Sequence, residues 1–421
     1  MQKEKRYLIS DRAAKNFGLA AFTICLLIQV AYIIAWWGTP PLSDCGTHFM
    51  LADYCVQHGE WYPAQKDIYH VYILAPTLIN YYALQLRMFG SLDYNSLINL
   101  VIACVITYEI WLLTLKLFSR RTAWLAVGVW SLLYSTWTSV VPAATELPFL
   151  VLALGGVCLS FSRKWVAVVL AGIAIALANT VRPLVVVFIP LAVAIMYKSH
   201  YSLMRYVTAG LACAATVLIV GMAVYAKIGY FVPQSSTGGL NLALTANSSA
   251  TGNYAAYYND PENEMYIEDM QHRTFAEKDS IWKARSIEWI KEHPGRYARL
   301  YLKKLAGMYS HDAVFEGYLY EDAIGYSASV ARGISYRDIM LQKMSKSVWY
   351  YCVLAMCLAT LVSRRRELLG MKGMVLSVTV LGTAVTALFS TMTRYHYPLM
   401  FPVVIWAAYG ISLLRKRVIS D

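Results

Sequence analysis

Charged residues are scarce in this sequence. Of its 421 residues, 15% are charged and 58% are hydrophobic, whereas a soluble domain is about 25% charged and about 45–50% apolar. Charge is missing from long apolar runs such as AWLAVGVWSLLYSTW and VAVVLAGIAIALAN. This shortage excludes an ordinary soluble protein, and the runs indicate an integral membrane protein with many spans.

Motifs of several soluble enzyme classes are also missing. The sequence has no Walker A loop, no HExxH and no GxSxG, and no CxxC or Cys/His spacing typical of a metal site. The first apolar run is long enough to span and lacks a convincing cleavage site, so we expect no cleavable signal peptide. No cytoplasmic domain is evident that could hold a soluble nucleotide-sugar, so an outward-facing active site would need a donor in the membrane.

Basic residues are in excess, with 37 Lys and Arg against 25 Asp and Glu. Much of the excess lies in short clusters between apolar runs, at 120–121, 163–164, 364–366 and 415–417. Such clusters mark the cytoplasmic ends of spans or contact anionic lipid. We therefore predict membrane lipids, and not nucleic acid, as the partner of this charge.

These clusters predict an all-α multi-pass protein with about ten transmembrane helices and both termini in the cytoplasm. The expected spans are 16–37, 94–117, 122–140, 146–161, 165–180, 184–197, 206–226, 347–363, 373–391 and 396–414. Segments 45–58 and 71–89 are expected to be juxtamembrane or re-entrant helices on the outer face, although 71–89 could also be a true span.

Three parts follow from this topology. Residues 1–227 form an N-terminal transmembrane module whose first external loop lies at about 38–93. Residues 228–346 form an external, mainly helical loop domain, with a helix that Pro294 begins. Residues 347–421 form the C-terminal transmembrane helices.

The stretch PLSDCGTH places Asp44 just after the first span, on the outer side. A carboxylate there can act as a general base on a substrate hydroxyl. The alternative is that Ser43 or Asp44 caps the helix that follows. His48 lies one helical turn further on, so the two side chains can face the same way. They could bind a metal, but no third ligand supports one.

Several cationic groups are expected to converge on the outer face. Arg182 lies in a short outer turn, and Arg394, Tyr395 and His396 lie in another, within TMTRYHYPLMFP. Arginine binds phosphate through paired hydrogen bonds, and outer arginines are unusual as topology signals. The alternatives are ordinary lipid headgroups or an ion pair with Asp44 or with Glu146, an acid where a span begins on the outer side.

The external region offers weaker candidates. Asn241 and Asn247 lie in the loop STGGLNLALTANSSATG, where side-chain amides could bind a sugar. Such composition is also typical of ordinary loops. Lys303 lies on the helix after Pro294 and is either a substrate contact or a solvated side chain.

Four ordered segments resemble the GT-C superfamily of glycosyltransferases that use polyprenyl-phosphate-linked sugars. The resemblance is to the branch of protein O-mannosyltransferases and lipid A aminoarabinose transferases. It is carried by SDCGTHFMLADYCVQHGEWYP, APTLINYYALQLRMFG, GGLNLALTANSSATG and TRYHYPLMFPVVIWAAYGI, which are spread over most of the chain in the family's order.

The resemblance implies a GT-C fold, with Asp44 in the position of the catalytic acid, Glu146 near a second acid and Arg394 at the lipid-linked phosphate. The charged Glu-Lys pair of aminoarabinose transferases is Leu74-Ala75 in this chain. Tyr69 or His70 is therefore the candidate to replace any contact that this pair makes.

The leading hypothesis is an inverting glycosyltransferase at the outer (periplasmic) face of a bacterial cytoplasmic membrane. Its donor is a polyprenyl-phosphate-linked sugar, and its acceptor is a lipid, a glycan or a protein. Asp44 is the general base, while Arg182, Arg394 and His396 hold the phosphate. No required cofactor is predicted. The alternative is an envelope polysaccharide polymerase or ligase, or a lipid-carrier flippase, without GT-C chemistry.

Overall fold

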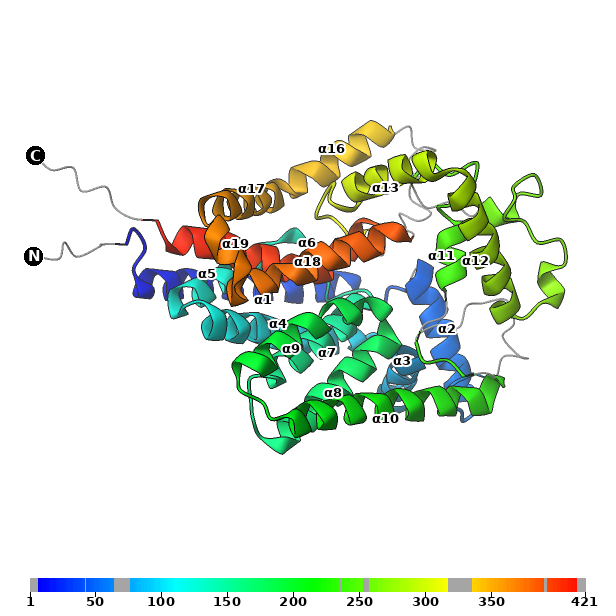
Figure 1. Cartoon of the computed structure of the whole chain (residues 1–421), viewed down its shortest axis with the longest axis horizontal. Helices are drawn as coiled ribbons and strands as arrows, with labels where there is room; N and C mark the ends of the chain where they lie inside the picture. The colour runs from blue at the N-terminus through cyan, green and yellow to red at the C-terminus, as the bar shows by residue number, and fades with distance from the viewer. Residues whose placement is uncertain are drawn as a thin grey trace, which may run out of the picture.

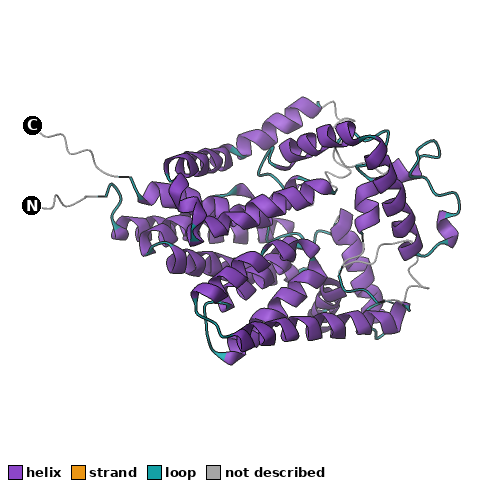
Figure 2. Cartoon of the chain, in the orientation of Figure 1, coloured by secondary structure: helices purple, strands orange, loops and turns teal. Residues whose placement is uncertain are grey.

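Helices make up the regular structure of the described part of the chain. The computed structural model describes residues 7–41, 43–63, 76–229, 231–234, 237–252, 257–316, 335–389 and 392–414. Within these ranges every regular element is an α-helix or a 3₁₀-helix, and no strand is present (Figure 2). The predicted all-α class is confirmed for the described residues.

Four helices are long and apolar enough to cross a membrane. They are α1 (Asp11–Trp36), α4 (Tyr94–Leu117), α10 (Leu203–Ile228) and α18 (Met371–Leu388). A fifth span is possible if α16 (Tyr336–Lys346) and α17 (Val348–Ser363) form one bent unit, with a break of 61° between them. All four long helices match expected spans, because each is a long apolar run without an internal break.

The other expected spans are shorter or interrupted helices. They are α5 (Arg120–Ser131) with α6 (Tyr134–Thr138), α7 (Glu146–Leu159), α8 (Trp165–Val181), η2 (Pro183–Val187) with α9 (Ile189–Lys198), and η6 (Thr393–Leu399) with α19 (Met400–Ser412). The segment expected as one span at 122–140 is thus divided into two helices. The number of about ten spans stays a prediction, as do the three-part division and the orientation in the membrane.

Helix α19 lies at the centre of the packing. It packs against α5 and α17 (Figure 1), and all of its residues from Met400 to Tyr409 are buried. A helix that is apolar on every side must be enclosed by other helices. The Trp406 indole NH donates to the Lys372 carbonyl oxygen at 3.0 Å, which satisfies its one polar atom within the core.

The remaining helices gather at one end of the molecule. They include α2 (Ser43–Gln57), α3 (Pro76–Phe89), α11 (Gly238–Ala243), α12 (Phe275–Glu292) and α13 (Pro294–Met308), with short turns η3 (Tyr257–Asn259) and η4 (Met270–His272). The first residues of α1 and the end of α19 lie at the opposite end (Figure 1), where the Leu8 amide donates to the Leu414 oxygen and η5 (Arg365–Leu369) also lies. Helices are confirmed in both expected outer segments, within 45–58 and 71–89; residues 71–75 lie outside the described ranges.

A seam between α13 and α18 secures the external helices to the core. The Tyr301 hydroxyl donates to the Ala384 carbonyl at 3.4 Å, and the Tyr309 hydroxyl is 2.5 Å from that of Thr383. Lys304 Nζ donates to the Phe389 carbonyl at 3.1 Å. A carbonyl at the end of a helix has no partner within the helix, so Lys304 supplies the donor that the Phe389 carbonyl needs. This seam fixes the end of α18, which precedes η6.

We expect Gly410→Ala to destabilise the protein. A Cβ at Gly410, on α19, would overlap the Thr360 hydroxyl of α17, so the two helices must move apart. Overpacking of this kind costs about 1–3 kcal/mol. The matched control is Gly210→Ala on α10, where a new Cβ meets nothing within 4 Å. Thermal unfolding in detergent should show a lower midpoint for the first variant and an equal or higher one for the control; equal midpoints would contradict this packing.

Candidate functional site

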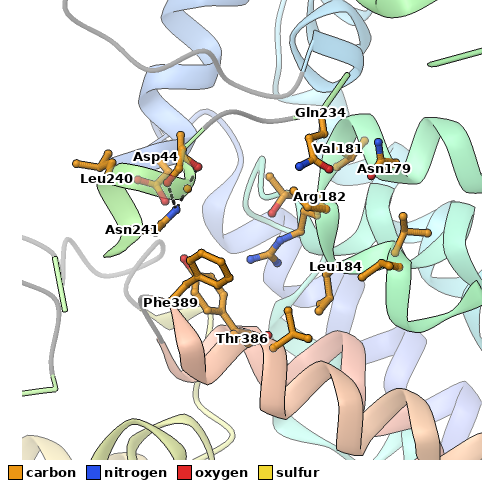
Figure 3. A pocket seen from close by; sticks show the side chains of 18 of the residues that line it. Asp44, Asn179, Val181, Arg182, Leu184, Gln234, Leu240, Asn241, Thr386 and Phe389 are labelled. Carbon is orange, nitrogen blue, oxygen red and sulfur yellow. Dashed lines mark hydrogen bonds between the residues drawn. The ribbon is translucent and has the colours of Figure 1, made fainter. Parts of the chain in front are cut away.

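A cavity of about 1000 Å³ lies where α2, η2, α11 and the end of α18 meet. Figure 3 shows Asp44, Arg182, Gln234 and Asn241 around it, with the apolar Leu184 and Phe389 nearby. Its polar part is lined by acids, arginines and amides, and its apolar part by aliphatic side chains of α8, η2 and α10. A cavity of this size and mixed lining fits an amphiphilic ligand.

Four charged side chains form a chain of alternating sign at this cavity. Arg394 on η6 forms an ion pair with Asp44 on α2. Arg394 Nε also lies 3.8 Å from Oε1 of Glu146, the first residue of α7. The same Glu146 oxygen accepts a hydrogen bond of 2.8 Å from Arg182 Nη1. The two carboxylates therefore neutralise the charge of the two guanidinium groups, which are largely removed from water and need negative partners.

The side chains of the two acids, Glu146 and Asp44, differ in how far they are exposed. The Glu146 side chain is 1% exposed and lies between both arginines, so it holds them in place. The Asp44 side chain is 52% exposed and contacts Arg394 from the cavity side. Asp44 is thus the acid that an incoming ligand can reach. Asp44 is the second residue of α2, which begins at Ser43. Its carboxylate forms the ion pair with Arg394.

Tyr395 provides an aromatic surface for both arginines. The Arg182 guanidinium lies 4.7 Å from the centre of its ring, and that of Arg394 lies 5.5 Å away. Cation–π contacts of this kind help to hold a guanidinium over the ring. Tyr395 lines the cavity, as do both arginines.

Charge interactions set the pKa values at this site. Burial raises the pKa of Asp44, but attraction and hydrogen bonding from Arg394 lower it further, so the net pKa lies below the ordinary value. Burial lowers the pKa of Arg394, but Tyr395 and the two carboxylates raise it, with a net rise. Burial lowers the pKa of His48 to about 4, against the opposing effect of Asp44. His48 is therefore a neutral cavity-lining residue at pH 7.

The structure does not bring His396 to the cavity. Its side chain is fully buried, with Nδ1 2.7 Å from the Met308 oxygen and Nε2 3.6 Å from Asp312 Oδ1. Asp312 Oδ2 in turn accepts a hydrogen bond of 3.0 Å from the Ser135 amide. These contacts anchor η6, so His396 supports the segment that carries Arg394.

The candidate amides have different positions. Asn241 lines the cavity, where its Nδ2 donates to the Thr237 oxygen at 2.7 Å (Figure 3). Asn247 is fully buried outside the cavity: its Nδ2 donates to the Ala243 oxygen and its Oδ1 accepts from the Ser249 amide. It therefore holds the loop in shape.

The remaining predicted residues lie away from the described cavity lining. Lys303 is exposed on α13 and is not among the lining residues. Tyr69 and His70 lie outside the described residues.

Several cavity residues carried no signal in the sequence. Asn179, Gln234, Asp279 and Lys283 line the cavity. Asp279 on α12 accepts a hydrogen bond of 2.8 Å from the Leu240 amide and thereby joins α12 to α11. Asn179, Gln234 and the α12 pair Asp279 and Lys283 lie far apart along the chain, so their packing brings them together.

A metal centre finds no support in the described residues. Within the described ranges, no three His, Cys, Asp or Glu side chains gather closely enough to hold a metal ion. Asp44 and His48 both line the cavity, as their spacing predicts.

Comparisons with known proteins give one structural match. Neither a protein-family model nor a curated protein matches this sequence. The fold is similar to the crystal structure of the oligosaccharyltransferase of Archaeoglobus fulgidus in complex with zinc and sulfate, with a TM-score of 0.41 and 12% identity. The match covers 94% of this chain and 54% of that one, so this chain spans about half of that protein's length. At this TM-score the match assigns no residue of the site.

We expect Lys304→Met to change how stability depends on pH. Lys304 is fully buried, and burial lowers its pKa to about 8, against about 10.4 in an unfolded chain. The unfolded state therefore binds more protons between pH 8 and 10.4, so Lys304 makes the protein more stable as the pH rises through that range. The contribution is up to about 3 kcal/mol.

Thermal unfolding midpoints measured from pH 7.5 to 10.5 test this expectation. The Lys304→Met variant should be less dependent on pH than the wild type. Lys303→Met is the matched control, because Lys303 is the exposed neighbour on the same helix and should leave the profile unchanged. Identical profiles for Lys304→Met and the wild type would show that Lys304 is solvated.

Proposed function

We propose that this protein is a membrane glycosyltransferase that moves a sugar from a polyprenyl-phosphate donor to an acceptor hydroxyl. The observation that carries the proposal is the ion pair of the half-exposed Asp44 with Arg394, backed by Glu146 and Arg182, at the edge of a large cavity. This arrangement supplies one accessible base and two fixed cations, which are the groups that transfer from a phosphate leaving group needs.

The reaction that these groups support is an inverting displacement. The Asp44 carboxylate takes the proton of the acceptor hydroxyl as its oxygen attacks the anomeric carbon. The bond from that carbon to the phosphate oxygen breaks, and the lipid phosphate leaves with the electron pair. Arg394 and Arg182 stabilise the charge that develops on it. A phosphate leaving group needs no general acid at neutral pH, so one base suffices.

The ion pairs seen in the site are compatible with phosphate binding. Asp44 and Glu146 neutralise the arginines, which keeps the two cations from repelling each other. A phosphate that binds Arg394 would take the place of Asp44. Once released, Asp44 loses the interaction that lowers its pKa, while burial still raises it. Donor binding would thereby make Asp44 a better base.

The apolar part of the cavity suits the lipid chain of the donor. Ile175, Val186, Ile189 and Val217 line it, and Val186 and Ile189 are exposed. Apolar side chains that are exposed on a membrane protein can contact lipid. We place this cavity at the outer, periplasmic face of a bacterial inner membrane, where the enzyme would act in building an envelope glycan.

Replacing Asp44 tests the base. We expect Asp44→Asn to reduce turnover of an undecaprenyl-phosphate-linked sugar by about 10²–10⁴-fold, the usual contribution of a general base. Asp53→Asn is the matched control, since Asp53 lies on the same helix and accepts a hydrogen bond from Gln57 outside the cavity. Near-normal turnover by Asp44→Asn, measured with purified protein in liposomes, would rule out this role.

Lipid binding separates the proposal from its rivals. We expect Arg394→Gln to weaken binding of undecaprenyl phosphate by about tenfold or more, because a charge-assisted hydrogen bond is lost. The control is Arg205→Gln, whose guanidinium lies over the Trp165 ring, 5.2 Å from its centre and outside the cavity. A preference for undecaprenyl diphosphate in the wild type would favour a polymerase, and lipid movement between leaflets without transfer would favour a flippase.

A further inference from the structure

A second, smaller cavity of about 220 Å³ lies beside the first. It is enclosed by residues 36–41, by α2, by residues 91–96 at the start of α4 and by residues 141–143. Its volume matches about one sugar ring, well below the 300–1,000 Å³ typical of sites for drug-sized ligands.

The lining of the small cavity differs in kind from that of the large one. Its walls carry the rings of Trp36, Trp37 and Phe49, with polar groups from Ser91, Asp93, Asn95, Ser96 and Thr39. None of the described residues that line it is Lys or Arg. The lining therefore offers no cation to a phosphate. It offers flat aromatic faces and hydrogen-bond partners to a neutral ring with hydroxyl groups.

One lining residue has an unused donor. Asn95 is 2% exposed, and its Oδ1 accepts a hydrogen bond of 3.3 Å from Gln85 Nε2. Asn95 Nδ2 has no partner among the described residues, and neither has Gln85 Oε1. If the N and O atoms of the Gln85 and Asn95 amides were both exchanged, one hydrogen-bond donor and one acceptor would still have no partner among the described residues. A buried polar group without a partner costs about 1–3 kcal/mol, so a ligand hydroxyl in this cavity would recover that loss.

The two cavities share a wall in the first turn of α2. Cys45 lines both of them, and its neighbour Asp44 lines the larger one. The preceding loop packs directly on this turn, since a Cβ at Gly46 would lie 2.9 Å from the Pro41 oxygen. A ring in the small cavity would contact Cys45, the residue that follows Asp44 in the chain.

We propose that the small cavity binds a sugar ring of the acceptor, so that the acceptor is a glycan or glycolipid. This inference rests on the proposed function and adds the acceptor class to it. The sugar ring stacks on Trp37 and binds Asn95. The acceptor then extends past Cys45, which lines both cavities, and its reacting hydroxyl group meets the donor in the large cavity, where Asp44 lies.

The test is sugar binding by the full-length protein in lipid nanodiscs. Saturation-transfer NMR is measured with methyl glycosides of glucose, mannose and N-acetylglucosamine, with binding expected in the millimolar range. We expect at least one glycoside to bind, and Asn95→Leu and Trp37→Leu each to weaken it by about fivefold or more. Trp37 is 46% exposed, so its replacement leaves the core intact even if Asn95→Leu impairs folding. Trp165→Leu, at an equally exposed tryptophan outside both cavities, should bind normally.

Undecaprenyl-phosphate binding by the same variants separates this inference from the proposed function. We expect Asn95→Leu and Trp37→Leu to bind the lipid normally. If the lipid binds but no glycoside does, or if glycoside binding survives both substitutions, the small cavity is not an acceptor site and the proposed function stands. If the glycoside binds but the lipid does not, the proposed donor is wrong. Transfer to a peptide acceptor that free glycosides do not inhibit would also overturn the sugar assignment.

Discussion

The contact on which the site depends is the shared neutralisation of two arginines by two acids. Arg394 and Arg182 come from different elements and meet at Glu146, while Asp44 completes the chain of charges from α2. A buried guanidinium without an acid is too costly to keep, so these four side chains fix the positions of α2, α7, η6 and the turn before η2 relative to one another. The shape of the large cavity follows from that arrangement.

The surrounding packing supports this cluster from behind. His396 holds η6 through the Met308 oxygen and Asp312, on the side away from the cavity. The seam of α13 on α18 fixes the chain just before η6, with Lys304 bonded to the Phe389 carbonyl. Residues that look like ligands in the sequence thus act as anchors, and they leave Arg394 as the cation that faces Asp44.

The two cavities differ in the charge of their linings, and each suits a different substrate of a transfer reaction. The large cavity has fixed cations and an apolar extension, which suit a lipid phosphate. The small cavity has aromatic rings, the Asn95 amide and a carboxylate without a lining cation among the described residues, which suits a neutral sugar. Both cavities border the first turn of α2, which carries Asp44 at the large cavity.

Much of this architecture follows from the sequence alone. Long uncharged runs must become helices in a membrane, since no water is there to satisfy the backbone, so hydropathy located the long apolar helices. The chemical types of Asp44, Glu146, Arg182 and Arg394 also marked them as candidates. The tertiary structure decided which acid pairs with which arginine, because Asp44 and Arg394 are 350 positions apart in the sequence. Orientation was left to it as well. Arg394 and His396 lie in one short segment, yet Arg394 lines the cavity and His396 is buried in the core. Lys303 and Lys304 are likewise neighbours on one helix, yet Lys303 is exposed and Lys304 is buried, because neighbours on a helix point in different directions.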